Sequence, residues 1–380
     1  MSISSRDLFN IPDDVTYLNC AYMGPQLKSV SDAGVTGLNR KEQPWEVLPG
    51  DFFDICEEAR ALFAQIIGAS PENIAITNAA SYGITTAAMN IPVQKGSRML
   101  MFEEQFPSNV YAWRKLAAEK GAHLEIIERR EGSDDLTPLI LDALGSGAAL
   151  LSLPHCHWTD GALIDMEAVG ERCVQLGVPL VIDGTQSIGA LPFDVKKVKP
   201  AFLTAATYKW LLGPYTLAFM YVDDAYLDGI PVEENWVNRA NSQDFASLVN
   251  YRDEYQPGAR RYDMGERSNF ISLPMASKAM RQILEWSVTG IAETTRSLTA
   301  LAAKLALQHG LDVPKPEFRS PHIIGIRFPD GVPPSLKPEL ARQNIHVSVR
   351  GNAVRISPHV YNSEVDVHRL FDVMIPLLNG

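Results

Sequence analysis

From about residue 50 onward, the sequence alternates short apolar runs with segments of helical periodicity. Most runs are almost continuously apolar, which is typical of strands covered by helices on both faces. The runs that predict strands are Ile74–Thr77, Met99–Phe102, Leu124–Ile127, Ala149–Leu153, Leu180–Ile182 and Leu217–Val222. Strands that alternate with helices form βαβ units. The pattern therefore predicts an α/β fold with one mostly parallel central sheet.

The pattern changes near residues 268–274. Long helical periodicity follows over Met275–His309, and Glu364–Leu378 predicts an amphipathic helix that closes the chain. Short strands are predicted between them at Ile323–Phe328, His346–Val349 and Val354–Ile356. We therefore expect a large domain over residues 31–269, and a smaller α+β domain that combines residues 1–30 with residues 270–380.

Composition excludes several classes of protein. Hydrophobic residues make up 46% of the 380 residues and charged residues 21%, a balance that can bury a large core. The formal charge is 34 − 45 = −11, and no basic block is present that could neutralise a nucleic-acid backbone. The longest uncharged stretch, 73–94, contains Asn and Pro residues unsuited to a membrane core. We expect neither nucleic acid nor membrane as a partner.

The cysteines, Cys20, Cys56, Cys156 and Cys173, lie far apart without a C-x-x-C pair. This spacing fits neither a zinc site nor a dense disulfide framework. The beginning of the chain also lacks the basic and apolar segments of a secretory signal. The sequence thus predicts a cytoplasmic protein without a metal site.

Two residues suggest a particular chemistry. Asp183 ends an apolar strand, and Lys209 follows 209 − 183 = 26 residues later, between an apolar run and a Gly-Pro turn. Parallel strands place ligands at their carboxyl ends, so both side chains should face one crevice. A deprotonated lysine forms Schiff bases, and an acid can hold a pyridine nitrogen protonated. The alternative is that Asp183 caps a helix and Lys209 is a solvated surface lysine.

The segments Asp183-Gly-Thr-Gln186 and Tyr208-Lys209-Trp-Leu-Leu-Gly-Pro resemble fold-type I pyridoxal-phosphate enzymes of the class V aminotransferase family. That family includes cysteine desulfurases, kynureninases and isopenicillin-N-epimerase-like proteins, and the resemblance runs from Tyr17 to about Leu370. It implies an aspartate-aminotransferase-like fold, with a large domain that binds pyridoxal 5'-phosphate and a smaller C-terminal domain. It also implies a homodimer that acts on an amino acid or a related amine.

The resemblance assigns roles at the cofactor's ring. Lys209 matches the lysine that forms the Schiff base, and Asp183 matches the catalytic partner of the pyridine nitrogen. Gln186 resembles the side chain that binds the cofactor's 3'-oxygen, with an ordinary helix-start glutamine as the alternative. Phe106 matches the aromatic residue that stacks on the ring. A core phenylalanine is its alternative.

Other positions resemble the family's phosphate site. Ala80 and Ser81 lie in a strand-to-helix turn whose free N–H groups favour a dianion. Ala80 can offer only its backbone, which leaves Ser81 as the hydroxyl donor. Tyr208 is expected at the phosphate, with a core tyrosine as the alternative, and Thr207 beside it is expected to bind the cofactor too.

The substrate side is assigned in the same way. His157 is expected to approach the cofactor or substrate as a catalytic residue, whereas His155 is equally well explained as structural. Arg355 resembles the guanidinium that binds the substrate's α-carboxylate. Arg350 is a second candidate, for which a surface ion pair is the alternative. Asn19 and Tyr22 resemble residues that touch substrate, with a structural turn as the alternative.

The resemblance also bears on subunit contacts and reaction type. The segment Gly265–Ser268 corresponds to a region that reaches the cofactor site of a neighbouring subunit. The segment Gly351–Val354 is short and lacks the nucleophilic cysteine that desulfurases carry there. We therefore expect an aminotransferase-like enzyme, with a C–S or C–N lyase or an epimerase as the alternative.

Alternatives from other classes are a dinucleotide-binding oxidoreductase and a catalytically silent protein with the same fold. The chain lacks a G-x-G-x-x-G sequence after its first strand, which disfavours the oxidoreductase. The presence of Asp183, Gln186 and Lys209 disfavours the silent protein.

Overall fold

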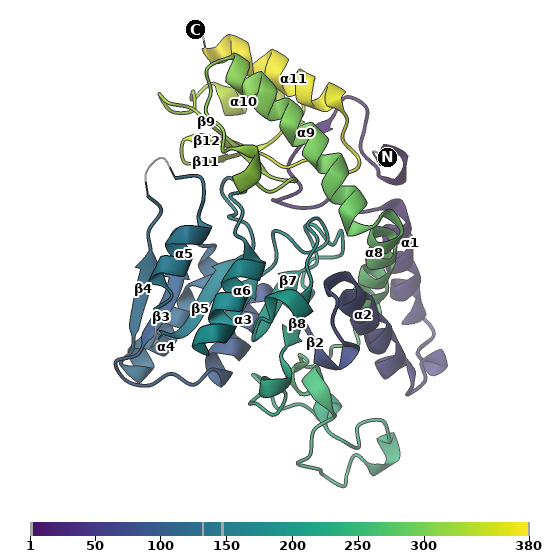
Figure 1. The fold of residues 1–380 in the computed structure, drawn as a ribbon. Coiled ribbons are helices and arrows are strands. Elements are labelled where there is room, and N and C mark those ends of the chain that lie inside the picture. Colours follow the sequence, from purple (N-terminus) through teal and green to yellow (C-terminus); the bar gives the residue numbers. More distant parts are fainter. Residues whose placement is uncertain (1–2, 131–132, 146–147, 379–380) are drawn as a thin grey trace.

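A computed structural model describes residues 3–130, 133–145 and 148–378 (Figure 1). The helices are α1 (Lys28–Arg40), α2 (Asp51–Ile67), α3 (Ala80–Asn90), α4 (Tyr111–Lys120), α5 (Thr137–Ala143), α6 (Met166–Leu176), α7 (Val195–Val198), α8 (Ser272–Trp286), α9 (Val288–Gln308), α10 (Leu336–Arg342) and α11 (Glu364–Met374). The strands are β1 (Thr16–Tyr17), β2 (Ile74–Thr77), β3 (Arg98–Phe102), β4 (His123–Ile127), β5 (Ala148–Pro154), β6 (Leu180–Asp183), β7 (Phe202–Ala206), β8 (Ala218–Val222), β9 (Ile324–Arg327), β10 (Ile345–His346), β11 (Ser348–Arg350) and β12 (Ala353–Ile356).

The central sheet has seven strands in the order β2-β8-β7-β6-β5-β3-β4. Strand β8 runs antiparallel to β2 and β7, and the other pairs are parallel. The predicted α/β fold with a mostly parallel sheet is therefore confirmed. Strand β7 was not among the predicted strands. The sequence indicated only an apolar run that precedes Lys209.

Helices cover both faces of this sheet, which explains the continuously apolar strands. Met99, Val181 and Phe202 pack with α3 and α4 on one face. Their neighbours Leu100 and Ile182 belong to the core on the other face, with α2, α5 and α6. Alternate residues of each strand thus meet different helical layers.

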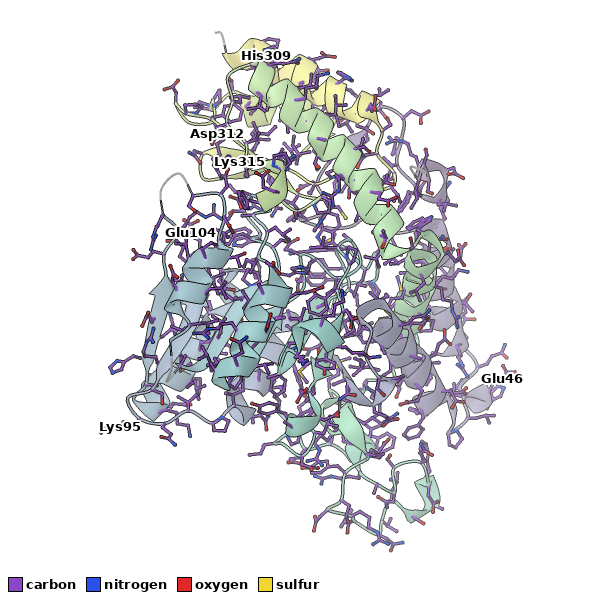
Figure 2. All side chains as sticks on the ribbon, viewed as in Figure 1. Glu46, Lys95, Glu104, His309, Asp312 and Lys315 are labelled. Carbon is purple, nitrogen blue, oxygen red and sulfur yellow. The ribbon has the colours of Figure 1, made fainter. Side chains whose placement is uncertain are left out.

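The carboxyl ends of the parallel strands face the C-terminal part of the chain. Figure 2 shows Lys95, which precedes β3, at one end of the sheet and Glu104, which follows β3, at the other, beside the C-terminal elements. Ligands of open α/β sheets bind at this end.

The C-terminal elements form a separate sheet and core. Strands β11, β12 and β9 make an antiparallel sheet that packs with α9 and α11 (Figure 1). The N-terminal segment joins this region, because β1 pairs in parallel with β10. The helical periodicity over Met275–His309 forms two helices, separated at Ser287, whose φ is 60°. The predicted boundary between the two domains at residue 269 stays a prediction. Helix α8, which follows this boundary, packs against α1 and α2.

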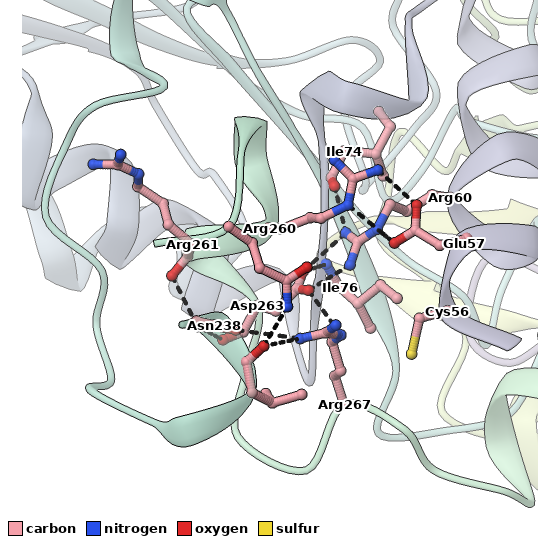
Figure 3. Close-up of polar contacts among 12 residues, drawn as sticks. Cys56, Glu57, Arg60, Ile74, Ile76, Asn238, Arg260, Arg261, Asp263 and Arg267 are labelled. Carbon is pink, nitrogen blue, oxygen red and sulfur yellow. Dashed lines mark hydrogen bonds and ion pairs between the residues drawn. The ribbon is translucent and has the colours of Figure 1, made fainter. Parts of the chain in front are cut away.

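A buried ionic network fixes the segment before α8 to β2 (Figure 3). Asp263 accepts hydrogen bonds from Ile76 N at 2.8 Å and from Arg60 Nη1 at 2.9 Å. Arg267 Nε lies 3.0 Å from Asp263 Oδ2, and all three charged side chains are fully buried. Because buried charges need partners, this network holds the segment that contains Gly265–Ser268 in one place.

Candidate active site

A cavity of about 510 Å³ lies at the carboxyl ends of the sheet strands. Among the predicted residues, those that line it are Ala80, Ser81, Phe106, Asp183, Gln186, Tyr208 and Lys209. They come from segments far apart in the sequence, which the parallel strands bring to the same end of the sheet. The expected crevice with both Asp183 and Lys209 is therefore present.

Lys209 is a buried amine in this cavity. Burial lowers the pKa of Lys209 to about 8; the carboxylate of Asp183 opposes this shift, and the positive charge of Arg355 adds to it. An amine with this pKa is partly unprotonated near neutral pH, and the unprotonated form is the nucleophile. Lys209 therefore differs chemically from a solvated surface lysine.

Asp183 ends β6 and lies in register with Thr204 of β7. Its Oδ1 accepts a hydrogen bond from Thr185 N at 3.0 Å. No described Lys, Arg or His forms an ion pair with Asp183. A carboxylate without a cationic partner can bind the protonated nitrogen of a pyridine ring.

The amino end of α3 opens into the cavity without a side-chain cap. Ala79 is the N-cap residue and makes no capping hydrogen bond, so the first N–H groups of the helix are available to an anion. Gly83 allows α3 to approach β7 closely, because a Cβ there would lie 2.7 Å from Thr204 Oγ1. This end of the cavity suits a phosphate group.

Phe106 offers an accessible aromatic face. Its side chain is 40% exposed, although Lys209 Nζ lies over its ring at 5.3 Å from the centre. Trp158 supports it edge to face, with ring centres 5.6 Å apart. A flat ligand ring can therefore stack there.

Gln186 and the N-terminal segment meet beside Lys209. Gln186 Nε2 donates to Ala21 O at 3.1 Å, and its Oε1 accepts from Trp210 Nε1 at 2.9 Å, so a second amide hydrogen is available for a ligand. Gly24 N donates to Tyr208 O at 2.9 Å, and a Cβ on Gly24 would lie only 2.2 Å from Lys209 O. The segment around Gly24 thus packs directly on the lysine loop.

His157, predicted as catalytic, and Thr207, predicted to bind the cofactor, do not line this cavity. The ring nitrogens of His157 lie 2.7 Å from Thr159 Oγ1 and 3.2 Å from Glu103 O, and burial lowers the pKa of His157. Thr207 Oγ1 donates to Pro214 O at 2.6 Å. His157 is therefore a neutral buried side chain with both nitrogens partnered, and Thr207 holds the loop that follows Lys209.

Asn19 and Tyr22 line a second cavity, of about 280 Å³, together with Ser348 and Arg350. Asn19 Oδ1 accepts from Ser348 Oγ at 2.9 Å, whereas Tyr22 is exposed. The structure thus separates these residues from the cavity of Lys209.

Arg355 lines neither cavity but contacts one lining residue of each, Trp158 and Ser348. It is 1% exposed, donates from Nη1 to Trp158 O at 2.6 Å, and lies 3.4 Å from Ser348 Oγ through Nη2. Its Nε has no hydrogen-bond partner, and no described acid forms an ion pair with it. Burial, with the nearby charge of Arg350, lowers the pKa of Arg355 to about 10. A buried guanidinium without an acid can receive a carboxylate.

Further lining residues were not predicted: Asn78, Ser108, Trp158, Thr185, Tyr215 and Thr216. Trp158 belongs to the same segment as His157, and only the register of that segment decides which of the two faces the cavity. Tyr215 and Thr216 lie in the turn before β8, where Thr216 has a φ of 68°. A turn of this kind has no periodicity from which side-chain direction could be predicted.

The cysteines, all within the described residues, are buried and free, and none lines the cavity of Lys209. Burial raises the pKa of Cys156 to about 12. Among residues 3–130, 133–145 and 148–378, no cluster of three or more His, Cys, Asp or Glu side chains could hold a metal ion. In the same ranges, no helix is both long and apolar enough to span a bilayer.

A lysine of lowered pKa, an unpaired acid, an aromatic face and an open helix terminus suit a pyridoxal-phosphate enzyme of fold type I. Comparison with solved structures shows a shared fold: the apo structure of a cysteine desulfurase from Thermococcus onnurineus NA1 superposes with a TM-score of 0.84 at 20% identity, over 100% of this chain and 99% of that one. A mutant of C-DES with glycine covalently linked to its PLP cofactor superposes with a TM-score of 0.83 at 17% identity, over 98% of this chain and 99% of that one.

Residues 45–370 match the family described as Aminotransferase class-V, and the chain belongs to that family. An uncharacterized aminotransferase, YcbU of Bacillus subtilis (strain 168), is 27% identical over 83% of this chain and 82% of its own. Kynureninase of Bacillus anthracis is 27% identical over 58% of this chain and 51% of its own. The chain is a pyridoxal-phosphate-dependent enzyme acting on an amino acid or a related amine. The predicted family and cofactor are confirmed.

Proposed function

We propose that this enzyme catalyses an aminotransferase-like reaction on α-amino acids in the cavity of Lys209. The observation that carries the proposal is that Lys209, with its lowered pKa, lines the same cavity as the unpaired acid Asp183. A lysine and an acid in these positions have complementary roles around one pyridine ring.

The cofactor-binding roles follow from the positions of the side chains. The N–H groups of Ala80 and Ser81 at the start of α3 bind the phosphate, and the face of Phe106 covers the ring. Asp183 would hold a proton on the ring nitrogen, and Gln186, whose amide has one hydrogen not used by Ala21, would donate to a ring oxygen. His157 and Thr207 support these groups from behind the cavity rather than touching the ligand.

Pyridoxal phosphate, when bound, supplies an electron sink for the bond that breaks at the substrate's Cα. Arg355 binds the substrate's carboxylate and thereby orients the Cα–H bond. Lys209 Nζ accepts the Cα proton, and its lowered pKa leaves a fraction of this amine unprotonated near neutral pH. Trp158, which is partly buried, lines the cavity beside Phe106 and limits the access of water on that side.

The reaction class depends on where Lys209 returns the proton. Delivery of the proton to an atom other than the substrate's Cα would give transamination, reprotonation of Cα with inverted configuration would give epimerisation, and loss of a side-chain group would give a lyase reaction. No persulfide role is assigned to the cysteines, because all four are buried away from the cavity. We therefore place aminotransferase-like chemistry first and a C–S or C–N lyase or epimerase second.

A homodimer is part of this proposal, with Gly265–Ser268 near the partner's cofactor. Exposed aromatic and apolar side chains support it: Trp45, Leu48 and Trp236 are all exposed. Glu266 and Ser268 line a cavity of about 640 Å³ beside Trp236. Exposed apolar groups of this kind mark interaction surfaces.

The free, buried cysteines are in keeping with the cytoplasm as the compartment.

A panel of amino acids, each incubated with the holoenzyme with and without a keto-acid acceptor, tests the proposal. We expect keto-acid production from one class of amino acid, dependent on the acceptor. Inverted stereochemistry or released ammonia without an acceptor would establish the second candidate instead. Retained cofactor with no spectral response to any amino acid would contradict both.

A further inference from the structure

Two arginines share one face of the β11–β12 hairpin. Ser348 pairs with Arg355 across the two strands, and Arg350 follows Ser348 by two residues. Side chains two residues apart on a strand point to the same face, as do directly paired residues. Arg350 and Arg355 are therefore diagonal neighbours on the face of Ser348.

This pair of positive charges has no anionic partner among the described residues. The Nε atoms of Arg350 and Arg355 are both buried without a hydrogen-bond partner. Arg350 donates from Nη1 only to its neighbour's carbonyl, Val349 O, at 2.8 Å. The second cavity contains Lys337 and His346 but no acid among its lining residues. Two adjacent guanidinium groups without a counter-charge repel each other, so the arrangement is suited to an added anion.

Trp158 connects this pair to the cavity of Lys209. Its ring lines that cavity and packs against Phe106, and Arg350 lies over the same ring at 5.4 Å from its centre. Its carbonyl accepts from Arg355. The guanidinium groups are thus held beside the wall of the active site that Trp158 forms.

We propose that Arg350 binds a second anionic group of the substrate, so that the enzyme acts on α-amino acids with an acidic side chain. This inference rests on the proposed function, in which Arg355 binds the α-carboxylate. Arg350 then receives a side-chain carboxylate, or an acidic group of similar shape, near the 280 Å³ cavity.

The cofactor's phosphate is a less suitable partner for Arg350. The open amino end of α3 lines the cavity of Lys209, whereas none of the residues that line Arg350's cavity belongs to α3. Arg350 is also absent from the residues that line the cavity of Lys209. The two anion positions are therefore distinct in the structure.

Calorimetric titration of the holoenzyme with unreactive acids tests this inference. Succinate and butyrate have carbon chains of similar length, but succinate carries two carboxylates and butyrate only one. We expect succinate to bind at least about 10-fold more tightly than butyrate, because a charged hydrogen-bonded pair is added. Arg350→Met keeps an unbranched side chain on Trp158. It should remove this difference in affinity by weakening the binding of succinate and leaving the binding of butyrate unchanged. Lys278→Met, which removes an exposed charge on α8, should change neither affinity.

Turnover provides the second readout. The ratio of kcat/KM for aspartate over asparagine, and for glutamate over glutamine, should fall at least about 10-fold in Arg350→Met. Equal affinity of the wild type for succinate and butyrate would overturn the inference. Loss of cofactor from Arg350→Met would overturn it too, since Arg350 would then serve the phosphate. Turnover of neutral amino acids alone would refute this inference and leave the proposed function intact, whereas absence of any turnover would refute the proposed function.

Discussion

Lys209 Nζ lies over the face of the Phe106 ring, 5.3 Å from its centre, at the carboxyl end of the central sheet. The two residues come from different strand ends, yet both line one cavity. An amine beside an aromatic face is suited to a flat ligand that is held at one end and stacked on one side. This relationship makes the contribution of Phe106 to cofactor binding measurable.

Replacement of Phe106 by Ala should weaken binding of pyridoxal phosphate about 2- to 12-fold, because stacking of aromatic rings contributes about 0.5–1.5 kcal/mol. Phe106→Tyr should retain the affinity. The ring is 40% exposed, so the melting temperature of the cofactor-free protein should be the same in both variants. Fluorescence titration with the cofactor measures the affinity, and equal affinity of Phe106→Ala and wild type would contradict the stacking role.

The rate at which cofactor-free enzyme takes up pyridoxal phosphate should rise with pH and level off above about pH 9. The unprotonated amine of Lys209 is required, and its pKa is about 8. The carboxylate of Asp183 stabilises the protonated amine, so Asp183→Asn should move the midpoint to lower pH. Arg355→Met should move it to higher pH. A wild-type midpoint near the ordinary lysine pKa of about 10.4 would contradict the effect of burial.

Replacement of Arg355 by Met should weaken the binding of α-amino acids about 10- to 100-fold, because a charged hydrogen-bonded pair is lost. Spectral titration of the holoenzyme with 2-aminobutyrate measures this loss. Propylamine, which lacks the carboxylate, provides the comparison. The affinity for propylamine should change less than about 3-fold. Equal weakening of both compounds would show that Arg355 acts on the structure of the site rather than on the carboxylate.

Asp263→Ala should lower the free energy of unfolding by about 3–5 kcal/mol, since it leaves Arg267 buried without its counter-charge and removes the buried partner of Arg60, which keeps only the partly exposed Glu57. Glu125→Ala removes a partner of Arg98 in an exposed pair and should cost about 0–1 kcal/mol. Urea denaturation of both variants without cofactor gives the comparison. Similar losses in the two variants would show that the buried network contributes no more than a surface pair.

Much of the fold follows from local sequence patterns. Continuously apolar runs such as Leu180–Ile182 predict buried strands, and strand ends predict where Asp183 and Lys209 lie. Helix α2 ends before Gly68, whose φ of 72° is a conformation that glycine adopts readily. Strand β7 was missed as a strand, since its Thr and Ala residues carry a weaker apolar signal than the neighbouring strands.

The parts that could not be predicted depend on tertiary contacts. Whether His157 or Trp158 faces the cavity depends on the pairing of Cys156 with Leu163, which no local pattern encodes. The break between α8 and α9 depends on a left-handed backbone at Ser287, a residue that carries no sequence signal for it. The separation of Asn19 from Lys209 likewise depends on how the N-terminal segment packs beside β11.

Borohydride reduction of the holoenzyme, followed by peptide mass spectrometry, tests the central claim most directly. We predict a phosphopyridoxyl group on the peptide that contains Lys209, and none in the Lys209→Ala variant. Labelling of another lysine, such as the exposed Lys196 or Lys199, with an unmodified Lys209 would contradict the account.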